Sequence, residues 1–292
     1  MSTKTTSIPR RVLVIGCGGN GSWLAPIIGR ILNINAPGSQ LMLVDGDNFE
    51  PKNAERQNFT KMGNKAKSVA SDLYDALENV SVIPKAIWVV PENADQADDG
   101  VGTITAGNLI EENDIIFLCV DNFAARKLVY DASQDLDNVI IMNGGNEDDG
   151  FGSTYLYIRE NGEDLTDHPG VHHPEFVEPP DRNPGSMSCA ERADLPSGTQ
   201  VIATNVAVAA TMAYDVRKLL FGDECDENTP DGYHRAGVLL TNEKMFHLDY
   251  GSSYTWARMN SELFSELCEI NAEVAENSHG QVVDLVLEPS NA

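Results

Sequence analysis

The stretch VLVIGCGGNGSWLA, residues 12–25, joins an apolar run to a glycine-rich turn and to the beginning of a helical pattern. The spacing of its glycines fits G-x-G-x-x-G. In such a turn the first glycine allows a tight bend, the second lets the backbone approach a phosphate, and the third lets the helix pack on the strand. The N-terminal N–H groups of the helix then attract the anion. The stretch therefore predicts a nucleotide-binding βα unit, with four glycines at the phosphate: Gly16, Gly18, Gly19 and Gly21.

Strand and helix patterns alternate through the first half of the chain. Short apolar runs rich in β-branched residues predict buried strands at 11–15, 41–44, 80–90, 114–120 and 138–143. Helical spacing predicts helices at 22–32, 64–78 and 123–135, and the polar stretch 91–108 predicts a loop. Pro84 favours an edge position or a break in its strand. The alternation indicates right-handed βαβ units and a parallel sheet covered on both faces.

The pattern changes after Asn143. We expect an antiparallel strand at 153–158, a long buried helix at 199–220, and a closing hairpin made of 237–241 and 244–250. The fold class predicted is α/β: a Rossmann-like three-layer fold whose mostly parallel sheet continues into antiparallel strands. The expected divisions are a nucleotide-binding domain at 1–160, a crossover loop at 161–198, a continuation of the same domain at 199–260, and a C-terminal tail at 261–292.

The chain is strongly acidic. Its 292 residues include 45 Asp and Glu against 20 Lys and Arg, a formal net charge of -25. Such a surface repels nucleic acids and anionic membranes, so we expect neither as a partner. It is typical of a highly soluble protein, and an acidic face that docks a basic protein is the alternative. With no membrane-length apolar run and no apolar core of a signal peptide in the first ten residues, a cytoplasmic protein is expected.

Five cysteines are scattered along the chain, and none forms a C-x-x-C pair. An odd, scattered set argues against a disulfide framework, and the missing pairs argue against a zinc site of four cysteines. No zinc is therefore expected. The cysteines are Cys17, Cys119, Cys189, Cys225 and Cys268.

Asp45 ends the second expected strand, at about the distance from the glycine turn where an acid binds ribose hydroxyls. Up to this residue, an NAD-dependent dehydrogenase explains the pattern. The segment after it changes the interpretation, because hydride transfer has no use for Asn-x-x-Arg-Gln beside a phosphate. That segment holds Asn53, Arg56 and Gln57, and Asp47 precedes it.

The ordered motifs between Gly16 and Lys127 resemble the E1-like ThiF/MoeB superfamily. Its members carry the glycine loop, an Asp-x-Asp at the end of the second strand and a following N-x-x-R-Q. A Lys then opens the next helix, and an Asp-Asn ends the fourth strand. This chain has every element in order: the glycines, Asp45 and Asp47, Asn53, Arg56 and Gln57, Lys67, and Asp121 and Asn122.

The resemblance implies an enzyme that uses ATP and Mg²⁺ to adenylate a C-terminal carboxylate. The partner would be a ubiquitin-like protein, a sulfur-carrier protein or a peptide, and members usually form homodimers. Adenylation builds negative charge on the phosphates, so catalysis depends on positioning and electrostatics. Each motif residue then has an implied role.

Arg56 and Lys67 would supply positive charge, and Asn53 a hydrogen bond. Asp121 would hold Mg²⁺, which prefers oxygen ligands; its alternative role is to cap the helix at 123–135. Nucleotide contacts are implied for the four glycines, for Asp45 at the ribose, and for Asp47, Gln57 and Asn122.

Cys189 lies where the crossover loop meets the long helix. In members of the superfamily, a cysteine in such a loop takes the acyl or sulfur group after adenylation, and a helix N-terminus lowers a thiol pKa. The alternative is a free, structural cysteine. His168, His172 and His173 in the same loop are expected to be solvated. Two other classes stay open: a degenerate module that binds nucleotide and partner without turnover, and an NAD-dependent oxidoreductase.

Overall fold

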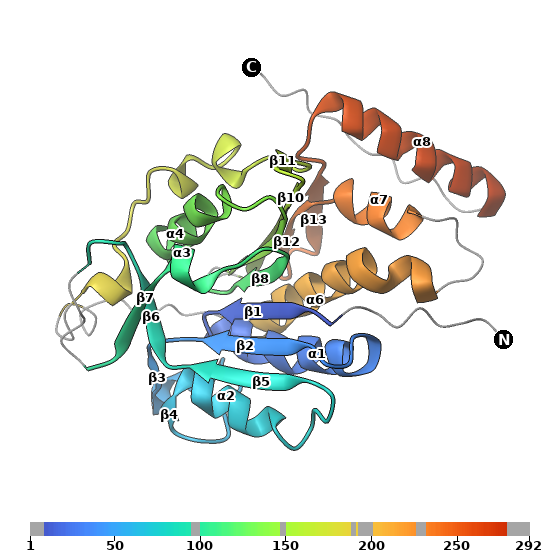
Figure 1. Cartoon of the computed structure of the whole chain (residues 1–292). Helices are drawn as coiled ribbons and strands as arrows, with labels where there is room; N and C mark the ends of the chain where they lie inside the picture. Colours follow the sequence, from blue (N-terminus) through green and yellow to red (C-terminus); the bar gives the residue numbers. More distant parts are fainter. Residues whose placement is uncertain are drawn as a thin grey trace.

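The structure is a computed structural model that describes residues 9–94, 100–146, 150–187, 191, 201–225 and 232–278. A central sheet lies between two layers of helices (Figure 1). Its strand order is β13-β12-β10-β9-β8-β1-β2-β5, and β11 pairs with β10 beside this path. These strands are β1 (Arg11–Ile15), β2 (Gln40–Val44), β5 (Ser81–Lys85), β8 (Asp114–Leu118), β9 (Val139–Asn146), β10 (Phe151–Glu160), β11 (Glu163–Asp164), β12 (Glu243–His247) and β13 (Ser252–Trp256).

The sheet is parallel in one half and antiparallel in the other. β1 pairs in parallel with β2 and β8, so that Val14 lies opposite Leu43 and Phe117. β5 and β9 extend this parallel part at its two sides. β10, β12 and β13 then add antiparallel strands next to β9. The fold class predicted from the sequence is confirmed.

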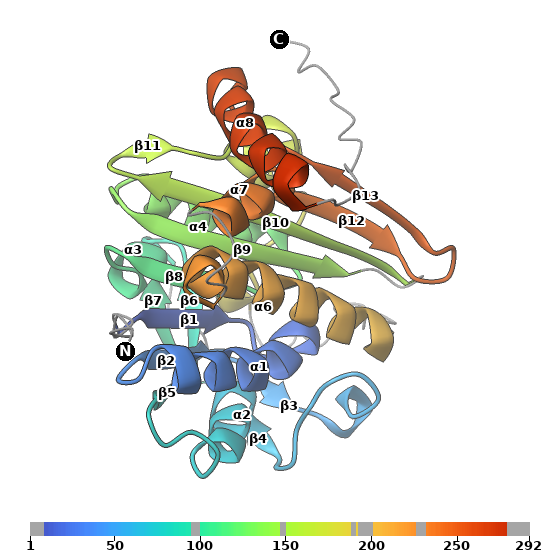
Figure 2. The same ribbon diagram turned by 90° about the vertical axis from the view of Figure 1, so that its right-hand side faces the viewer.

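Helices cover both faces of the sheet, which explains why its central strands β1, β2 and β8 are almost continuously apolar. Val12 and Val14 of β1 point into one core and Leu13 and Ile15 into the other. The first core lies under α1 (Gly19–Asn35), α2 (Lys65–Leu73), α6 (Ile202–Cys225), α7 (Tyr233–Leu239) and α8 (Ser261–Ser278), and Figure 2 shows α6 beside α1 on this face. The second lies under α3 (Ala106–Leu109) and α4 (Phe123–Ser133).

The apolar segment 80–90 forms two strands, where one was expected. β5 is the edge strand of the main sheet, a position that tolerates Pro84 because the outer side needs no N–H partner. The chain then leaves the sheet, and β6 (Ile87–Val90) pairs in parallel with β7 (Gly102–Thr105). The expected loop at 91–108 is therefore wrong in part, since it holds β7 and most of α3.

The expected strand at 237–241 is also wrong. These residues belong largely to α7, which packs against α6 and α8, and the closing hairpin is formed by β12 and β13. A short apolar run does not distinguish a buried strand from a buried helix by its periodicity. Here Ala236, Val238 and Leu239 are all buried because neighbouring helices cover α7.

The crossover segment is more ordered than expected in its described part. It contains three short 3-10 turns, η2 (Pro169–Val171), η3 (Pro174–Phe176) and η4 (Pro184–Ser186). Phe176 is buried against Tyr130 of α4 and anchors the segment to the sheet domain. Over the described ranges, no helix has the length and apolar character needed to cross a bilayer.

An ion cluster ties this segment to β12. The Glu243 carboxylate, 3% exposed, lies 2.7 Å from His173 Nε2 and accepts a hydrogen bond from Arg258 Nε at 2.5 Å. His172 Nε2 lies 2.7 Å from Asp167 Oδ2. The expectation of solvated histidines is wrong for these two, whose side chains are 16% and 22% exposed and carboxylate-paired. Burial alone would raise the pKa of Glu243, but the bonds and charges of His173 and Arg258 outweigh it and lower the pKa.

We expect Glu243→Gln to lower the free energy of unfolding at pH 7 by about 2–4 kcal/mol, because it leaves Arg258 without its carboxylate. The folded-state pKa of Glu243 is lowered from 4.5, so its stabilisation is complete above that pH and is lost as the pH falls through the folded value. Urea unfolding at pH 7 and at pH 3 should show a difference between wild type and variant that shrinks at pH 3. An equal difference at both pH values would contradict this account.

Candidate functional site

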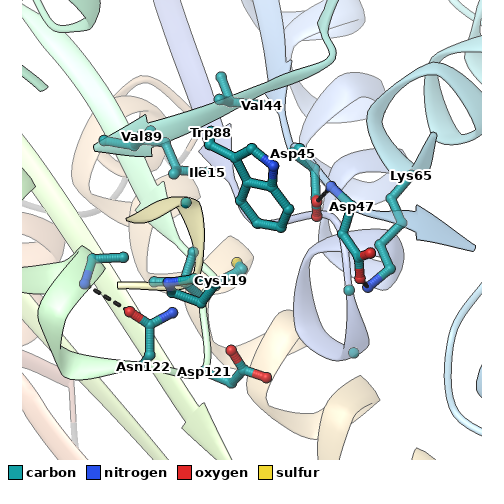
Figure 3. A pocket seen from close by; sticks show the side chains of 18 of the residues that line it. Ile15, Val44, Asp45, Asp47, Lys65, Trp88, Val89, Cys119, Asp121 and Asn122 are labelled. Carbon is teal, nitrogen blue, oxygen red and sulfur yellow. Dashed lines mark hydrogen bonds and ion pairs between the residues drawn. The ribbon is translucent and has the colours of Figure 1, made fainter. Parts of the chain in front are cut away.

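A cavity of about 520 Å³ opens at the carboxyl ends of β1, β2, β8 and β9 (Figure 3). Open α/β sheets bind their ligands at this edge. Most of the residues selected from the sequence line it: Gly16, Gly18, Gly19, Asp45, Asp47, Asn53, Arg56, Gln57, Asp121 and Asn122. Gly21 lies beneath the turn, Lys67 lies outside the cavity, and Cys189 lies outside the described residues.

The glycine turn joins β1 to α1 with no room for side chains. Gly16 has a φ of +90°, and a Cβ on Gly21 would lie 1.9 Å from the Gly16 carbonyl oxygen. Gly18 faces the cavity, where an added Cβ would contact only Gln57 Nε2, at 3.6 Å. No side chain caps the start of α1, so its first N–H groups are left for a ligand.

Asp45 is fixed at the end of β2 by backbone donors. Its Oδ2 accepts the N–H of Cys17 at 2.7 Å and its Oδ1 accepts the N–H of Asp47 at 2.8 Å. Burial raises the pKa of Asp45, against the lowering effect of the Lys65 charge. Each carboxylate oxygen has a further lone pair, so the group can also accept hydrogen bonds from ribose hydroxyls.

Lys65 lines the cavity, and Lys67 does not. Its Nζ lies 2.5 Å from Asp47 Oδ2 and its side chain is 12% exposed. Burial by itself would lower the pKa of Lys65, but the charges of Asp45 and Asp47 outweigh it and raise the pKa, so this residue is a fixed cation. α2 begins at Lys65, after its Asn64 cap. Lys67 is exposed because two residues along a helix are about 200° apart around its axis.

The segment that carries Arg56 is pinned to two helices. The Arg56 carbonyl accepts hydrogen bonds from Trp23 Nε1 of α1 and Asn205 Nδ2 of α6, both at 3.1 Å. Within the described residues, the buried atoms Arg56 Nε, Gln57 Oε1 and Asn20 Oδ1 have no hydrogen-bond partner, and Arg56 forms no ion pair. Buried polar groups are normally satisfied, so unpartnered atoms on a cavity wall fit a polar ligand.

Asp121 and Asn122 follow β8 at the opposite wall of the cavity (Figure 3). Asn122 caps α4, because its Oδ1 accepts the N–H of Ala125 at 2.7 Å. The alternative role of Asp121 as a helix cap is therefore wrong, and its exposed carboxylate remains at the cavity. The first two N–H groups of α4, on Phe123 and Ala124, both donate to Asp181 of the crossover segment at 2.8 Å.

The cavity also includes residues that the sequence motifs did not indicate. Asn20 and Asn146 line it near the glycine turn and at the end of β9, and Trp88 and the η4 segment line it from the other side. The sequence signal for Lys65 was its position: it lies two residues before Lys67 and is also a lysine at the start of the predicted helix. The others have no local signal, because Trp88 lies in a strand outside the main sheet and η4 arrives from the crossover segment.

A family model described as the ThiF family matches residues 7–253. The chain belongs to the ThiF family. The resemblance inferred from the ordered motifs is therefore confirmed.

Solved structures show the same ThiF fold. A crystal structure of E. coli MccB with ATP matches at a TM-score of 0.56 and 19% identity, over 86% of this chain and 64% of that chain. A structure of PaaA matches at 0.55 and 16% identity, over 86% and 64%. This chain thus spans a little less than two thirds of each. No curated protein sequence matches the chain.

We expect Lys65→Ala to weaken ATP binding by about 100-fold and Lys67→Ala to change it less than about twofold. Removing the Lys65 cation leaves Asp45 and Asp47 uncompensated beside the phosphates, whereas Lys67 lies outside the cavity. Isothermal titration with ATP measures both variants, and circular dichroism checks that each is folded. Equal losses in the two variants would show that Lys65 has no special place in this ThiF-family site.

Proposed function

We propose that this protein uses ATP and Mg²⁺ to adenylate the C-terminal carboxylate of a peptide or small protein. The observation that carries the proposal is the placement of Arg56 and Lys65 in the cavity. In a chain of net charge -25, Arg56 and Lys65 line the same cavity as the glycine turn and the uncapped start of α1. Together these groups offer N–H donors and positive charge to a polyphosphate. Support also comes from the fold neighbours, which include MccB with ATP and MccB with MccA.

In the proposed reaction a carboxylate oxygen of the acceptor attacks the α-phosphorus of ATP. The bond from that phosphorus to the bridging oxygen breaks, an acyl-adenylate forms, and pyrophosphate leaves with the bonding electrons. Arg56 and Lys65 stabilise the negative charge that grows on the phosphates. Asn53 donates a hydrogen bond to the phosphates, and Asp45 accepts hydrogen bonds from the ribose hydroxyls.

Asp121 is the candidate ligand for Mg²⁺. Its exposed carboxylate lines the cavity at the end of β8, within electrostatic reach of Lys65. Mg²⁺ is usually bound by one or two carboxylates together with substrate phosphates, so a single carboxylate on the cavity wall fits it. When bound, the ion neutralises charge on the phosphates.

An NAD-dependent oxidoreductase is the second candidate, and Asp45 favours it as much as it favours adenylation. Arg56 and Lys65 favour adenylation, since hydride transfer builds no charge on a phosphate. A degenerate module would bind ATP and partner but show no turnover. Tight NAD binding without ATP binding would select the oxidoreductase, and ATP binding without pyrophosphate exchange would select the module.

The finer parts of the proposal concern the acceptor and the steps after adenylation. The acceptor is a ubiquitin-like protein, a sulfur-carrier protein or a peptide, and the MccA complexes favour a peptide. The protein acts as a homodimer. If transfer follows, the Cys189 thiolate attacks the acyl carbon of the adenylate, AMP leaves, and a thioester forms.

ATP–pyrophosphate exchange tests the adenylation step. We expect exchange with an acceptor that ends in a free carboxylate and none with the same acceptor amidated at its C-terminus, because only the carboxylate supplies a nucleophile. The probes are the MccA peptide and a ubiquitin-like protein. Arg56→Ala should lower kcat/KM for exchange by about 100- to 1000-fold, the usual effect of removing one charge-stabilising group. Exchange that persists with the amidated acceptors would exclude the proposed nucleophile.

The transfer step has its own test. We expect Cys189→Ser to leave exchange within about twofold of wild type, since the thiol acts only after the adenylate has formed. The same variant should lose a thiol-sensitive adduct with the acceptor on a non-reducing gel, while Cys268→Ser serves as the matched control and keeps it. An adduct that survives in Cys189→Ser would give Cys189 a structural role.

A further inference from the structure

The turn that carries Asp121 leads directly into α4. No hydrogen bond or ion pair to another described residue holds the Asp121 carboxylate, which lies at the cavity beside Asn122 (Figure 3). Its direction therefore depends on the backbone of the turn and on the start of the helix. Asn122 fixes one part of that start, because its Oδ1 accepts the N–H of Ala125 at 2.7 Å. The N–H groups of the two residues between them need other acceptors.

Asp181 of the crossover segment supplies both acceptors. Its Oδ2 accepts the N–H of Phe123 and its Oδ1 accepts that of Ala124, each at 2.8 Å. One carboxylate thus closes the start of the helix, from a position 58 residues further along the chain than Phe123. Asp181 does not itself line the cavity, whereas Asp121 does. Asp181 therefore acts on a bound group only at a distance, through α4 and through its own charge.

A buried guanidinium lies within electrostatic reach of both carboxylates. Arg126 is 8% exposed, and its Nε and Nη2 donate to the Val120 carbonyl at 3.2 and 2.9 Å, which fixes the residue before Asp121. Burial lowers the pKa of Arg126, and the negative charges of Asp121 and Asp181 are among those that act against this effect. The two carboxylates are therefore close enough to act on the same cation.

The charge of Asp181 also bears on a cation at Asp121. The N-terminus of a helix carries the positive end of its dipole, which opposes the binding of a metal ion nearby. A carboxylate on the first two N–H groups offsets this positive end. Asp181 thus favours a divalent cation at Asp121 in two ways, by fixing the turn and by offsetting the helix dipole. Its charge does not favour the phosphates of a nucleotide, because like charges repel each other.

We propose that Asp181 is a positioning residue for Mg²⁺, and that it sets the affinity of the ion at Asp121 by holding the start of α4. The inference rests on the proposed function, which assigns Asp121 as the magnesium ligand. Groups that orient a metal ligand without touching the metal commonly change metal affinity by about 10- to 100-fold. Through Asp181 the crossover segment becomes part of the metal site, and by linkage bound Mg²⁺ stabilises this segment on α4.

The test is isothermal titration of the full-length protein with ATP in the absence of an acceptor, once with EDTA and once with Mg²⁺. The ratio of the two affinities measures how far Mg²⁺ strengthens ATP binding. We expect Asp181→Asn to lower this ratio about 10-fold, because asparagine keeps one acceptor but loses the second one and the charge. ATP affinity in EDTA should stay within about twofold of wild type or become tighter, since a negative charge has been removed. A merely structural role would weaken ATP binding equally under both conditions.

Asp131→Asn is the matched control. Asp131 lies on the same helix, is exposed and pairs with Lys127, so the variant makes the same change of charge away from the start of the helix. It should leave the ratio within about twofold of wild type. Asp121→Asn is the reference for loss of the ligand, and Asp181→Asn should add no further loss in that background, since both residues act on one site. An unchanged ratio in Asp181→Asn, or independent losses in the double variant, would overturn the inference.

The two proposals fail separately. Pyrophosphate exchange together with an unchanged ratio in Asp181→Asn keeps adenylation and removes the positioning role. A lowered ratio in Asp181→Asn, with no exchange for any carboxylate acceptor, keeps the positioning role and overturns adenylation. A wild-type protein whose ATP binding is not strengthened by Mg²⁺ overturns the inference whatever the result of exchange.

Discussion

The close approach of Gly16 and Gly21 is the constraint on which the rest of the site depends. A side chain on Gly21 would overlap the Gly16 carbonyl, so only glycine lets α1 start directly above the end of β1. This contact leaves the uncapped N-terminus of α1 facing the cavity. The hydrogen bond from the Cys17 N–H to Asp45 then ties the end of β2 to the same turn. The glycine turn, the start of α1 and the Asp45 carboxylate are thus held in one unit.

Charged side chains surround this unit. The chain has a large excess of acidic residues, and two of them, Asp45 and Asp47, raise the pKa of the largely buried Lys65 and keep it charged. Arg56 has no such partner in the described part of the chain, and its backbone is pinned to α1 and α6. Lys65 therefore keeps its charge while paired within the protein, and Arg56 lines the same cavity. The cavity thus brings three cations, Lys52, Arg56 and Lys65, together with the carboxylates of Asp45, Asp47, Glu50 and Asp121.

The crossover segment connects the nucleotide cavity to the rest of the domain. Asp181 accepts two N–H groups at the start of α4, Asn183 holds β6, and Gly185 packs against Trp88. Between η2 and η3, His173 of the same segment lies within hydrogen-bond distance of Glu243 of β12. The described part of the crossover segment is therefore anchored both at the cavity, through Asn183, and at β12, through His173.

The sequence by itself determined the βα unit, the parallel strands and the ordered motif residues, because glycine spacing, apolar runs and short-range charge patterns are local properties. The same local patterns gave the wrong secondary structure where packing against other elements determines it. GVLL at 237–240 is helical because α6 and α8 cover it, and 80–90 divides because β6 leaves the edge of the sheet. Only the tertiary structure selected Lys65 over Lys67, since a helix directs residues two apart to opposite sides. It alone brought Trp88 between Gly46 and Gly185, because contacts between distant segments form only when the whole chain has folded.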